Sequence, residues 1–185
     1  MWNQLDALTG LLNQNSYLNR TAEMRRSGEV LVVFDVDDFK QVNDRYGHVK
    51  GDICLAEIAA CIKKAYARHG YCYRTGGDEF CVLLRDGDWE HACARDFVRR
   101  LDERRKELDF LPTVSFGSAE ISSENVVTVK DRADHNMYRY KKERKAHRMS
   151  GDAGRGSNRE EASPWDRRNG ARWSKASAQS ADCPS

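Results

Sequence analysis

Two short acidic clusters contain the residues of this sequence best suited to chemistry. Asp35 and Asp37 follow an apolar run, and Asp78 and Glu79 follow a pair of glycines. Carboxylates that lie together repel one another unless a cation or hydrogen bonds compensate their charge. Oxygen donors suit a hard ion such as Mg²⁺, and a pair of such ions can activate a hydroxyl and stabilise a transferring phosphoryl group. The alternative is that Asp35 and Asp78 are ordinary strand-end and turn residues.

Basic residues and a predicted helix start near these clusters favour a phosphate ligand. Phe39 and Lys40 follow the first acidic cluster, where the amides at a helix start can bind phosphate. Lys141 and Lys145 are one helical turn apart, so they point the same way and could clamp terminal phosphates. For these two lysines alone, a solvated basic face is the simpler interpretation.

Polar residues between the clusters could bind a nucleobase. Asn43, His48 and Asp52 supply hydrogen-bond donors and acceptors, and an aspartate can accept two hydrogen bonds from a guanine edge. A histidine such as His48, taken alone, is more often a packed or capping residue than a ligand. The glycine pair at 76–77 would let the backbone turn sharply and approach a ligand closely.

The charge balance excludes a general attraction to nucleic acid. The 185 residues include 31 Lys and Arg against 29 Asp and Glu, a formal net charge of +2, so any anion site must be local. The length allows one domain of ordinary size with appendages. No apolar run is long enough to span a membrane, and residues 1–6 do not resemble a signal peptide.

The cysteines favour a reducing compartment, and we expect the protein in the cytoplasm. They form no Cys-x-x-Cys pair and lie mostly inside hydrophobic segments, which argues against a zinc site or a disulfide framework. The six are Cys54, Cys61, Cys72, Cys81, Cys93 and Cys183.

The composition changes at about residue 150. Residues 150–185 contain no Val, Ile, Leu, Met, Phe or Tyr, so they cannot bury enough surface to offset the entropy of ordering. We predict a folded domain over 1–149 and a disordered polar tail over 150–185, in which Trp165 and Trp173 are solvated.

Hydrophobic periodicity predicts alternating strands and helices in the folded part. The strands are expected at 30–34, 71–75, 80–84 and 113–121. Four helices are expected: one that begins near Asn13, one through 55–66, one over 89–108 and one over 127–148. Gly70 is expected to close the second of these helices.

Apart from the first helix, this order is the split β-α-β-β-α-β arrangement, an α+β fold. A right-handed first crossover leaves the first and second strands parallel, with the third strand between them. The end of the first strand then lies at the same sheet edge as the hairpin. We therefore expect Asp35 and Asp37 to face Asp78 and Glu79.

Four segments, in this order and spacing, resemble the GGDEF domain of bacterial diguanylate cyclases. They are DALTGLLN (6–13), FDVDDFKQVNDRYGHVKGD (34–52), RTGGDEF (74–80) and ADHNMYRYKK (133–142). The resemblance implies a palm-type nucleotidyl cyclase domain. Its expected core is ferredoxin-like, with a central, mainly antiparallel sheet flanked by helices.

The resemblance also implies a reaction, in which two GTP condense to cyclic di-GMP and release two pyrophosphates. The 3′-hydroxyl of one GTP attacks the α-phosphate of the other, with Mg²⁺ or Mn²⁺ as cofactor. Each domain supplies half of the site, so a homodimer is required. Family members usually carry an upstream sensory, receiver or membrane module, so we expect a fragment or isolated domain here. The alternative is a catalytically weak or inactive GTP-binding regulatory domain.

Residue roles follow from the resemblance by position. Asp35, Asp78 and Glu79 would be the catalytic residues and metal ligands, together with the backbone carbonyl of Val36, and Glu79 would help to deprotonate the attacking hydroxyl. The remaining substrate-binding positions are Phe39, Lys40, Lys141 and Lys145 for phosphates, Asn43, His48 and Asp52 for guanine, and Arg74 as a brace or phosphate ligand.

Three positions bear on specificity and regulation. Members that make a mixed GMP-AMP product carry serine where Asp52 stands, so cyclic di-GMP is expected here. The family's inhibitory Arg-x-x-Asp is replaced by Ala-Arg-His-Gly at 67–70, which predicts weak or absent product inhibition. Lys145 stands where arginine is usual, and a lysine lacks the bidentate fork that grips a triphosphate.

Overall fold

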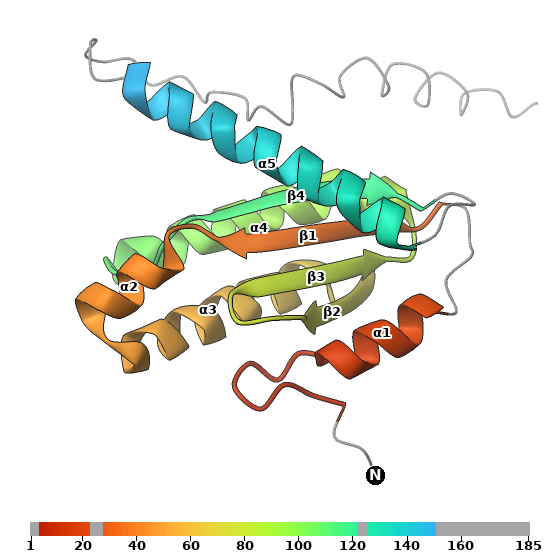
Figure 1. Ribbon diagram of the computed structural model, residues 1–185, viewed down its shortest axis with the longest axis horizontal. Helices are drawn as coiled ribbons and strands as arrows, with labels where there is room; N and C mark the ends of the chain where they lie inside the picture. The colour runs from red at the N-terminus through yellow and green to blue at the C-terminus, as the bar shows by residue number, and fades with distance from the viewer. Residues whose placement is uncertain (1–3, 23–27, 122–125, 151–185) are drawn as a thin grey trace, which may run out of the picture. The chain divides into compact units, whose positions relative to one another are not determined.

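The computed structural model describes residues 4–22, 28–121 and 126–150, which form one antiparallel sheet flanked by helices (Figure 1). The strands are β1 (Val30–Val36), β2 (Gly70–Arg74), β3 (Glu79–Leu84) and β4 (Val114–Glu120). The helices are α1 (Gln14–Ala22), α2 (Phe39–Tyr46), α3 (His48–Tyr66), α4 (Glu90–Glu107) and α5 (Val126–Ser150), with a 3-10 turn η1 (Gly87–Trp89) before α4.

The sheet has the predicted topology. Its strand order is β2-β3-β1-β4, and β1 pairs antiparallel with both β3 and β4. Because β3 also pairs antiparallel with β2, β1 and β2 run parallel with β3 between them. The α+β fold with a β-α-β-β-α-β core is therefore confirmed.

Alternating residues of β1 build two apolar layers, one on each face of the sheet. Phe34 packs on the side of α3 and α4, with its ring centroid 5.6 Å from that of Tyr66 and 5.2 Å from that of Phe97. Leu31 and Val33 face the other way, into a cluster with residues of α1 and α5. Both faces of the sheet are thus covered, and this rigid double layer holds the end of β1 in place.

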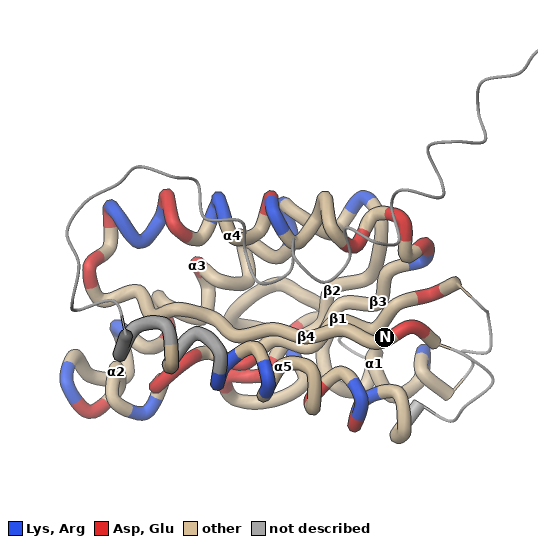
Figure 2. The backbone as a smooth tube through the Cα atoms, turned by 90° about the horizontal axis from the view of Figure 1, so that it is seen from above, with Lys and Arg blue, Asp and Glu red and all other residues tan. Residues whose placement is uncertain are grey.

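Helix α4 shows how a strongly charged segment stays helical. Its buried residues are Cys93, Ala94, Phe97 and Leu101, a spacing that lines one face of a helix. On its outer face Arg99 and Arg100 lie 2.6 and 2.8 Å from the carboxylate oxygens of Asp96. Figure 2 shows the acidic and basic residues interleaved along α4, whereas the strands of the sheet are almost free of charge.

Gly117 allows α5 to lie directly against β4. A Cβ atom on Gly117 would overlap the backbone nitrogen of Met137 and lie 2.5 Å from the carbonyl oxygen of Ala133. Only a residue without a side chain permits this approach. The contact fixes the position of α5 one turn before Lys141.

Two details differ from the prediction for the region after β1. The helix predicted to start near Phe39 is a separate short helix, α2, which ends at Tyr46, and α3 begins at His48 and not near Leu55. Gly70 does not close the helix: α3 ends at Tyr66, and Gly70 is the first residue of β2. A Cβ on Gly70 would overlap the carbonyl oxygen of Leu83, so glycine is needed for strand pairing and not for a helix end.

The chain divides into two units, residues 1–144 and 145–185, and α5 runs across that boundary. The second unit is described only at the end of α5, so the predicted boundary at 149 stays a prediction. The predicted tail beyond Ser150, with Trp165, Trp173 and Cys183, lies outside the described residues. The other cysteines are buried and unpaired. No helix in the described part of the chain is long and apolar enough to cross a membrane.

Candidate active site

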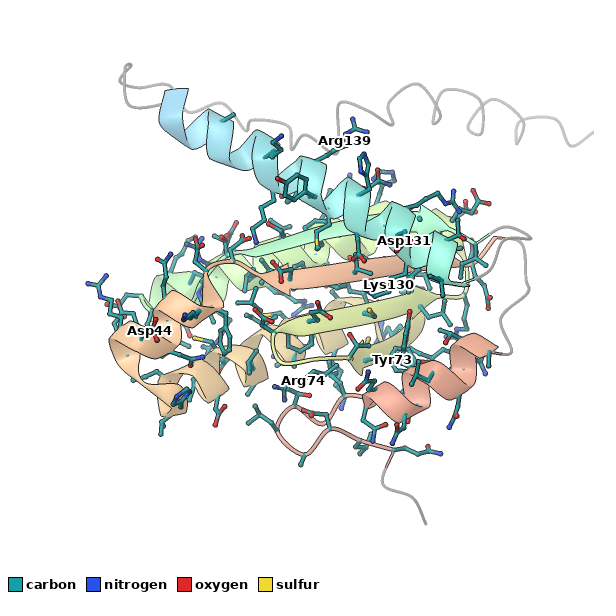
Figure 3. All side chains as sticks on the ribbon, viewed as in Figure 1. Asp44, Tyr73, Arg74, Lys130, Asp131 and Arg139 are labelled. Atoms are coloured by element: carbon teal, nitrogen blue, oxygen red, sulfur yellow. The ribbon has the colours of Figure 1, made fainter. Side chains whose placement is uncertain are left out.

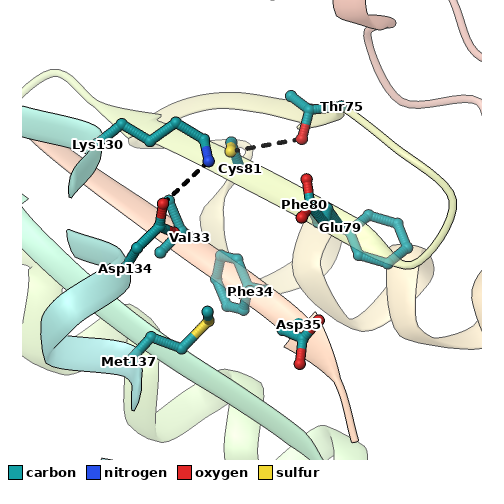
Figure 4. Close-up of a pocket in the computed structure, with 10 residues that line it drawn as sticks. All are labelled: Val33, Phe34, Asp35, Thr75, Glu79, Phe80, Cys81, Lys130, Asp134 and Met137. Atoms are coloured by element: carbon teal, nitrogen blue, oxygen red, sulfur yellow. Dashed lines mark hydrogen bonds and ion pairs between the residues drawn. The ribbon is translucent and has the colours of Figure 1, made fainter. Parts of the chain in front are cut away.

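The end of β1 and the start of β3 bring two carboxylates together at one edge of the sheet. Asp35 is the cross-strand partner of Glu79, and the amide of Val36 donates to the carbonyl oxygen of Asp78 at 3.3 Å. Directly opposed residues place their side chains on the same face of a sheet, and Figure 4 shows Asp35 and Glu79 on neighbouring strands. The predicted meeting of the two acidic clusters is therefore observed for Asp35 and Glu79.

Lys141 of α5 supplies a cation to this edge. Its Nζ lies 2.7 Å from Oδ2 of Asp35 and 3.2 Å from Oδ1 of Asp37. The three side chains are mostly buried, with 25%, 26% and 13% of their surface exposed. Burial acts to lower the pKa of Lys141, but the hydrogen bonds and charges of Asp35 and Asp37 outweigh it and raise the pKa above its usual value. The lysine is therefore a firmly held positive charge.

Asp37 is fixed from the other side by Ser115 of β4 and by Thr113, the residue directly before that strand. Its Oδ2 accepts a hydrogen bond from the Thr113 hydroxyl at 2.7 Å, and its Oδ1 accepts one from the Ser115 hydroxyl at 2.8 Å. Ser115 is fully buried and is the cross-strand partner of Asp35 on β4. The position of Asp37 at this edge was predicted from the sequence, whereas its partners Thr113 and Ser115 were not. The available signal was a serine inside the apolar strand β4.

Arg74 braces the hairpin that carries Asp78 and Glu79. Its Nη2 and Nε donate to the carbonyl oxygen of Gly77 at 2.8 and 3.2 Å. Its Nη1 lies 3.1 and 3.2 Å from the two carboxylate oxygens of Asp6. Figure 3 shows Arg74 beside the loop that precedes α1. Of the two predicted roles for Arg74, this arrangement supports the brace.

Asp6 is itself held in place by local hydrogen bonds. Its Oδ1 accepts from the amide of Thr9 at 2.9 Å and from the hydroxyl of Thr9 at 2.7 Å. Burial acts to raise the pKa of Asp6, but the hydrogen bonds from Thr9 and Arg74 outweigh it and hold the pKa below its usual value. The loop before α1 is thereby tied to the hairpin through one carboxylate.

The start of α2 offers backbone donors close to the acidic edge, the edge of the sheet that carries Asp35, Asp78 and Glu79. Asp38 precedes the helix with φ 55°, and its side chain does not cap the first turn. The first amides of a helix lack partners within the helix, so those of Phe39 and Lys40 are placed to meet a phosphate oxygen. The side chain of Lys40 is exposed.

The predicted guanine-binding residues lie on α2 and α3. Asn43 packs on the buried Gly51, where a Cβ would overlap the Asn43 amide oxygen and lie 3.3 Å from Cζ of Phe39. His48 and Asp52 are exposed in the first turns of α3. Gly51 thus holds Asn43 in position, a contribution that the sequence analysis missed.

Lys145 is the one predicted site residue whose side chain lies outside the described residues. It follows Lys141 in α5, and its phosphate-binding role stays a prediction.

A small cavity of about 20 Å³ lies under α5, next to the acidic edge (Figure 4). Asp35, Glu79 and the ion pair of Lys130 and Asp134, 3.0 Å apart, line part of it. Cys81 also lines it, and burial raises the pKa of this thiol to about 11. The space would hold about one water molecule, so a nucleotide must bind outside it.

The donor chemistry of the edge fits a hard divalent cation. The carboxylates of Asp35, Asp78 and Glu79 and the carbonyl of Val36 are all oxygen ligands, which Mg²⁺ prefers. Within the described ranges, no three carboxylate, imidazole or thiol side chains converge as a ready ligand set. Lys141 instead occupies one oxygen of Asp35.

Together, the sheet order and the acidic edge define an α+β domain of the palm-type nucleotidyl cyclase class. The family model for the diguanylate cyclase GGDEF domain matches residues 3–147. The chain therefore belongs to the GGDEF family, as the sequence motifs predicted.

Relatives and solved structures agree with this assignment. Diguanylate cyclase DgcS of Shewanella oneidensis is 35% identical over 146 residues, 74% of this chain and 49% of that protein. The probable diguanylate cyclase DgcJ of Escherichia coli is 29% identical over 142 residues, 72% of this chain and 28% of that protein. An uncharacterised signalling protein of Caulobacter vibrioides is 41% identical over 104 residues, 53% of this chain and 13% of that protein. The chain thus spans less than half the length of each of these relatives.

Among solved structures, the GGDEF domain of DgcB from Caulobacter crescentus, in complex with c-di-GMP, superposes with a TM-score of 0.67 at 27% identity. The match covers 77% of this chain and 92% of that one. The diguanylate cyclase SiaD from Pseudomonas aeruginosa, in complex with its activator SiaC, gives a TM-score of 0.63 at 32% identity and covers 76% of this chain and 59% of that one.

Proposed function

We propose that this domain is a diguanylate cyclase, which condenses two GTP into cyclic di-GMP and releases two pyrophosphates. The observation that carries the proposal is the acidic edge, where Asp35 stands opposite Glu79 and next to Lys141. Family membership and the diguanylate cyclases among the relatives support the same reaction.

Binding of GTP would use both sides of the edge. The amides of Phe39 and Lys40 at the start of α2 would meet phosphate oxygens, with the Lys40 side chain close by. Lys141 and Lys145 would approach the triphosphate from α5. Guanine would bind over α2 and α3, where Asn43 and Asp52 supply polar groups and His48 belongs to the same motif. Because positioning accounts for most of phosphoryl-transfer catalysis, these contacts carry much of the rate.

A divalent cation, Mg²⁺ or Mn²⁺, would supply charge stabilisation and activation of the attacking 3′-hydroxyl. Asp35, Asp78, Glu79 and the Val36 carbonyl would hold it. Glu79 is exposed at the start of β3, so it can reach a hydroxyl proton on a nucleotide that lies over the edge. Arg74 fixes the Gly77 carbonyl and so keeps the hairpin, with both acidic residues, in one geometry.

Within the residues that the structure describes, one chain presents one acidic edge, whereas the product joins two nucleotides. We propose that two copies face each other, each with one bound GTP, and that the 3′-hydroxyl held by one attacks the α-phosphate held by the other. An additional module in the parent protein would bring the two copies together, because the chain spans only part of its relatives' length.

Product formation tests this proposal, with GTP and Mg²⁺ at high protein concentration and chromatographic separation of the product. The wild type should make cyclic di-GMP, and Glu79→Gln, which removes a carboxylate without changing the size of the side chain, should make at least about a hundredfold less. GTP binding without product, even when two copies are fused to a dimeric scaffold, would support the alternative of a regulatory GTP-binding domain. In that case Lys145→Arg, which restores the arginine usual in the family, is the first variant to test.

A further inference from the structure

We propose that Asp37 is a positioning residue that keeps Lys141 in the site when a divalent cation binds the Asp35 carboxylate. Lys141 and the cation then compete for Asp35, and Asp37 is the acceptor to which the lysine moves. This inference rests on the proposed function, because it concerns the cation of that reaction.

The geometry around Lys141 gives the lysine two acceptors of different kinds. The shorter contact, 2.7 Å, is to Asp35, the proposed metal ligand at the end of β1. The longer contact, 3.2 Å, is to Asp37, which is not among the predicted metal ligands. An ammonium group has three donors on a flexible stem, so it can release one carboxylate and keep the other.

Asp37 is suited to hold the lysine because it is itself immobilised. The hydroxyls of Thr113 and Ser115 each donate to one of its carboxylate oxygens, at 2.7 and 2.8 Å. The backbone amide of Asp37 also donates to the carbonyl of Thr113 at 2.9 Å. Because these hydrogen bonds tie Asp37 to Thr113 and to Ser115 of β4, Asp37 stays in place when the charge beside it changes.

The helix that carries Lys141 cannot make this adjustment by moving away. Gly117 seats α5 against β4, with no room for a side chain between Met137 and the strand. The lysine backbone is therefore fixed one turn beyond this contact, and the exchange between Asp35 and Asp37 must take place in the side chain.

Charge explains why the exchange is needed. Without a divalent cation, Lys141 compensates the carboxylates of Asp35 and Asp37. A cation on Asp35 would meet the like charge of Lys141 at close range, and like charges a few ångströms apart repel strongly in a half-buried site. The lysine thus lowers the affinity for the cation until it withdraws toward Asp37.

Binding of Mn²⁺ to the nucleotide-free protein, followed by the electron paramagnetic resonance signal of free Mn²⁺, tests the competition. Lys141→Met should bind Mn²⁺ tighter than the wild type by roughly tenfold or more. Lys142→Met is the matched control, because Lys142 is exposed and its Nζ lies 5.6 Å from the Tyr138 ring centroid. This control should bind Mn²⁺ as the wild type does. Equal or weaker binding by Lys141→Met would overturn the competition.

A double-mutant cycle tests the role of Asp37. Asp37→Asn retains a side chain that can pair with both hydroxyls but removes the charge that attracts Lys141. It should weaken Mn²⁺ binding several-fold in the wild-type background and much less in the Lys141→Met background. An equal loss of Mn²⁺ affinity in both backgrounds would show that Asp37 either coordinates the ion or attracts it through its negative charge alone. Either result would overturn its positioning role.

The outcomes separate this inference from the proposed function. If the wild type fused to a dimeric scaffold makes no cyclic di-GMP although the predicted Mn²⁺ pattern is found, the proposed function fails and the inference about Lys141 stands. If product is formed but Lys141→Met does not bind Mn²⁺ more tightly, the inference fails alone.

Discussion

At the scale of single residues, three aspartates, Asp6, Asp35 and Asp37, differ in role because they have different hydrogen-bond partners. Asp35 faces both Glu79 and Lys141 and can exchange its partner. Asp37 is held by Thr113 and Ser115, and Asp6, in the loop before α1, is held by Arg74. The residue types alone did not separate these roles, because the sequence shows only that all three are aspartates. Their hydrogen-bond partners come from segments distant in the chain.

The Asp6–Arg74 pair predicts a specific pH dependence of stability. The pKa of Asp6 is lowered in the folded state, so its contribution is present above the unfolded value near 3.8 and is lost as the pH falls through the folded value. Asp6→Asn should therefore destabilise the protein by about 1 kcal/mol at neutral pH, and the difference should shrink below about pH 4. Urea unfolding of both proteins from pH 7 to pH 3 measures it. A difference that does not change with pH would contradict the role of the Asp6 charge.

Gly51 offers a second test at this scale. Gly51→Ala would push the Asn43 side chain out of place and should raise the KM for GTP by roughly tenfold, with less effect on kcat. The helix itself should not suffer, because alanine favours a helix interior over glycine by up to about 1 kcal/mol. Steady-state kinetics together with thermal unfolding separate these effects. An unchanged KM would show that Asn43 does not contact the base.

At the scale of elements, the strands are predictable because each is a short apolar run bounded by turn residues. Their order in the sheet is predictable because strands and helices alternate in the split β-α-β-β-α-β pattern. The split arrangement then leaves one place for the acidic hairpin, so the meeting of Asp35 with Glu79 is predictable. Helix α2 is harder to predict, since Val42 is its only buried residue among eight. The prediction that Gly70 ends a helix is wrong because glycine also occurs where two strands pair closely, as β2 and β3 do at Gly70. The contacts of Asp37 with Thr113 and Ser115 depend on the register between β1 and β4, which periodicity does not give.

The seat of α5 on β4 leads to a prediction for Gly117. Gly117→Ala should force the helix and strand apart, with a loss of stability of about 1–3 kcal/mol. It should also weaken GTP binding, because Lys141 would no longer reach the acidic edge. Urea unfolding and GTP titration of the folded variant measure the two effects. A variant with wild-type stability would contradict the close packing of α5 on β4.

At the scale of the whole molecule, the proposed reaction depends on the meeting of two copies. The described part of one chain provides a single acidic edge, and the proposed reaction joins two nucleotides. Specific activity should therefore rise with protein concentration, and fusion to a dimeric scaffold should raise activity at low concentration. Initial rates over a hundredfold range of protein concentration check this. A specific activity independent of concentration would contradict catalysis between transiently paired copies.

The most direct test of the central claim is the product made from GTP and Mg²⁺ by the wild type and by Glu79→Gln, each fused to the same dimeric scaffold. The account predicts cyclic di-GMP from the wild-type fusion and at least about a hundredfold less from the variant, with the same thermal unfolding for both. GTP bound by the wild-type fusion without formation of cyclic di-GMP would contradict the account. Equal amounts of product from the two fusions would contradict the catalytic role of the acidic edge.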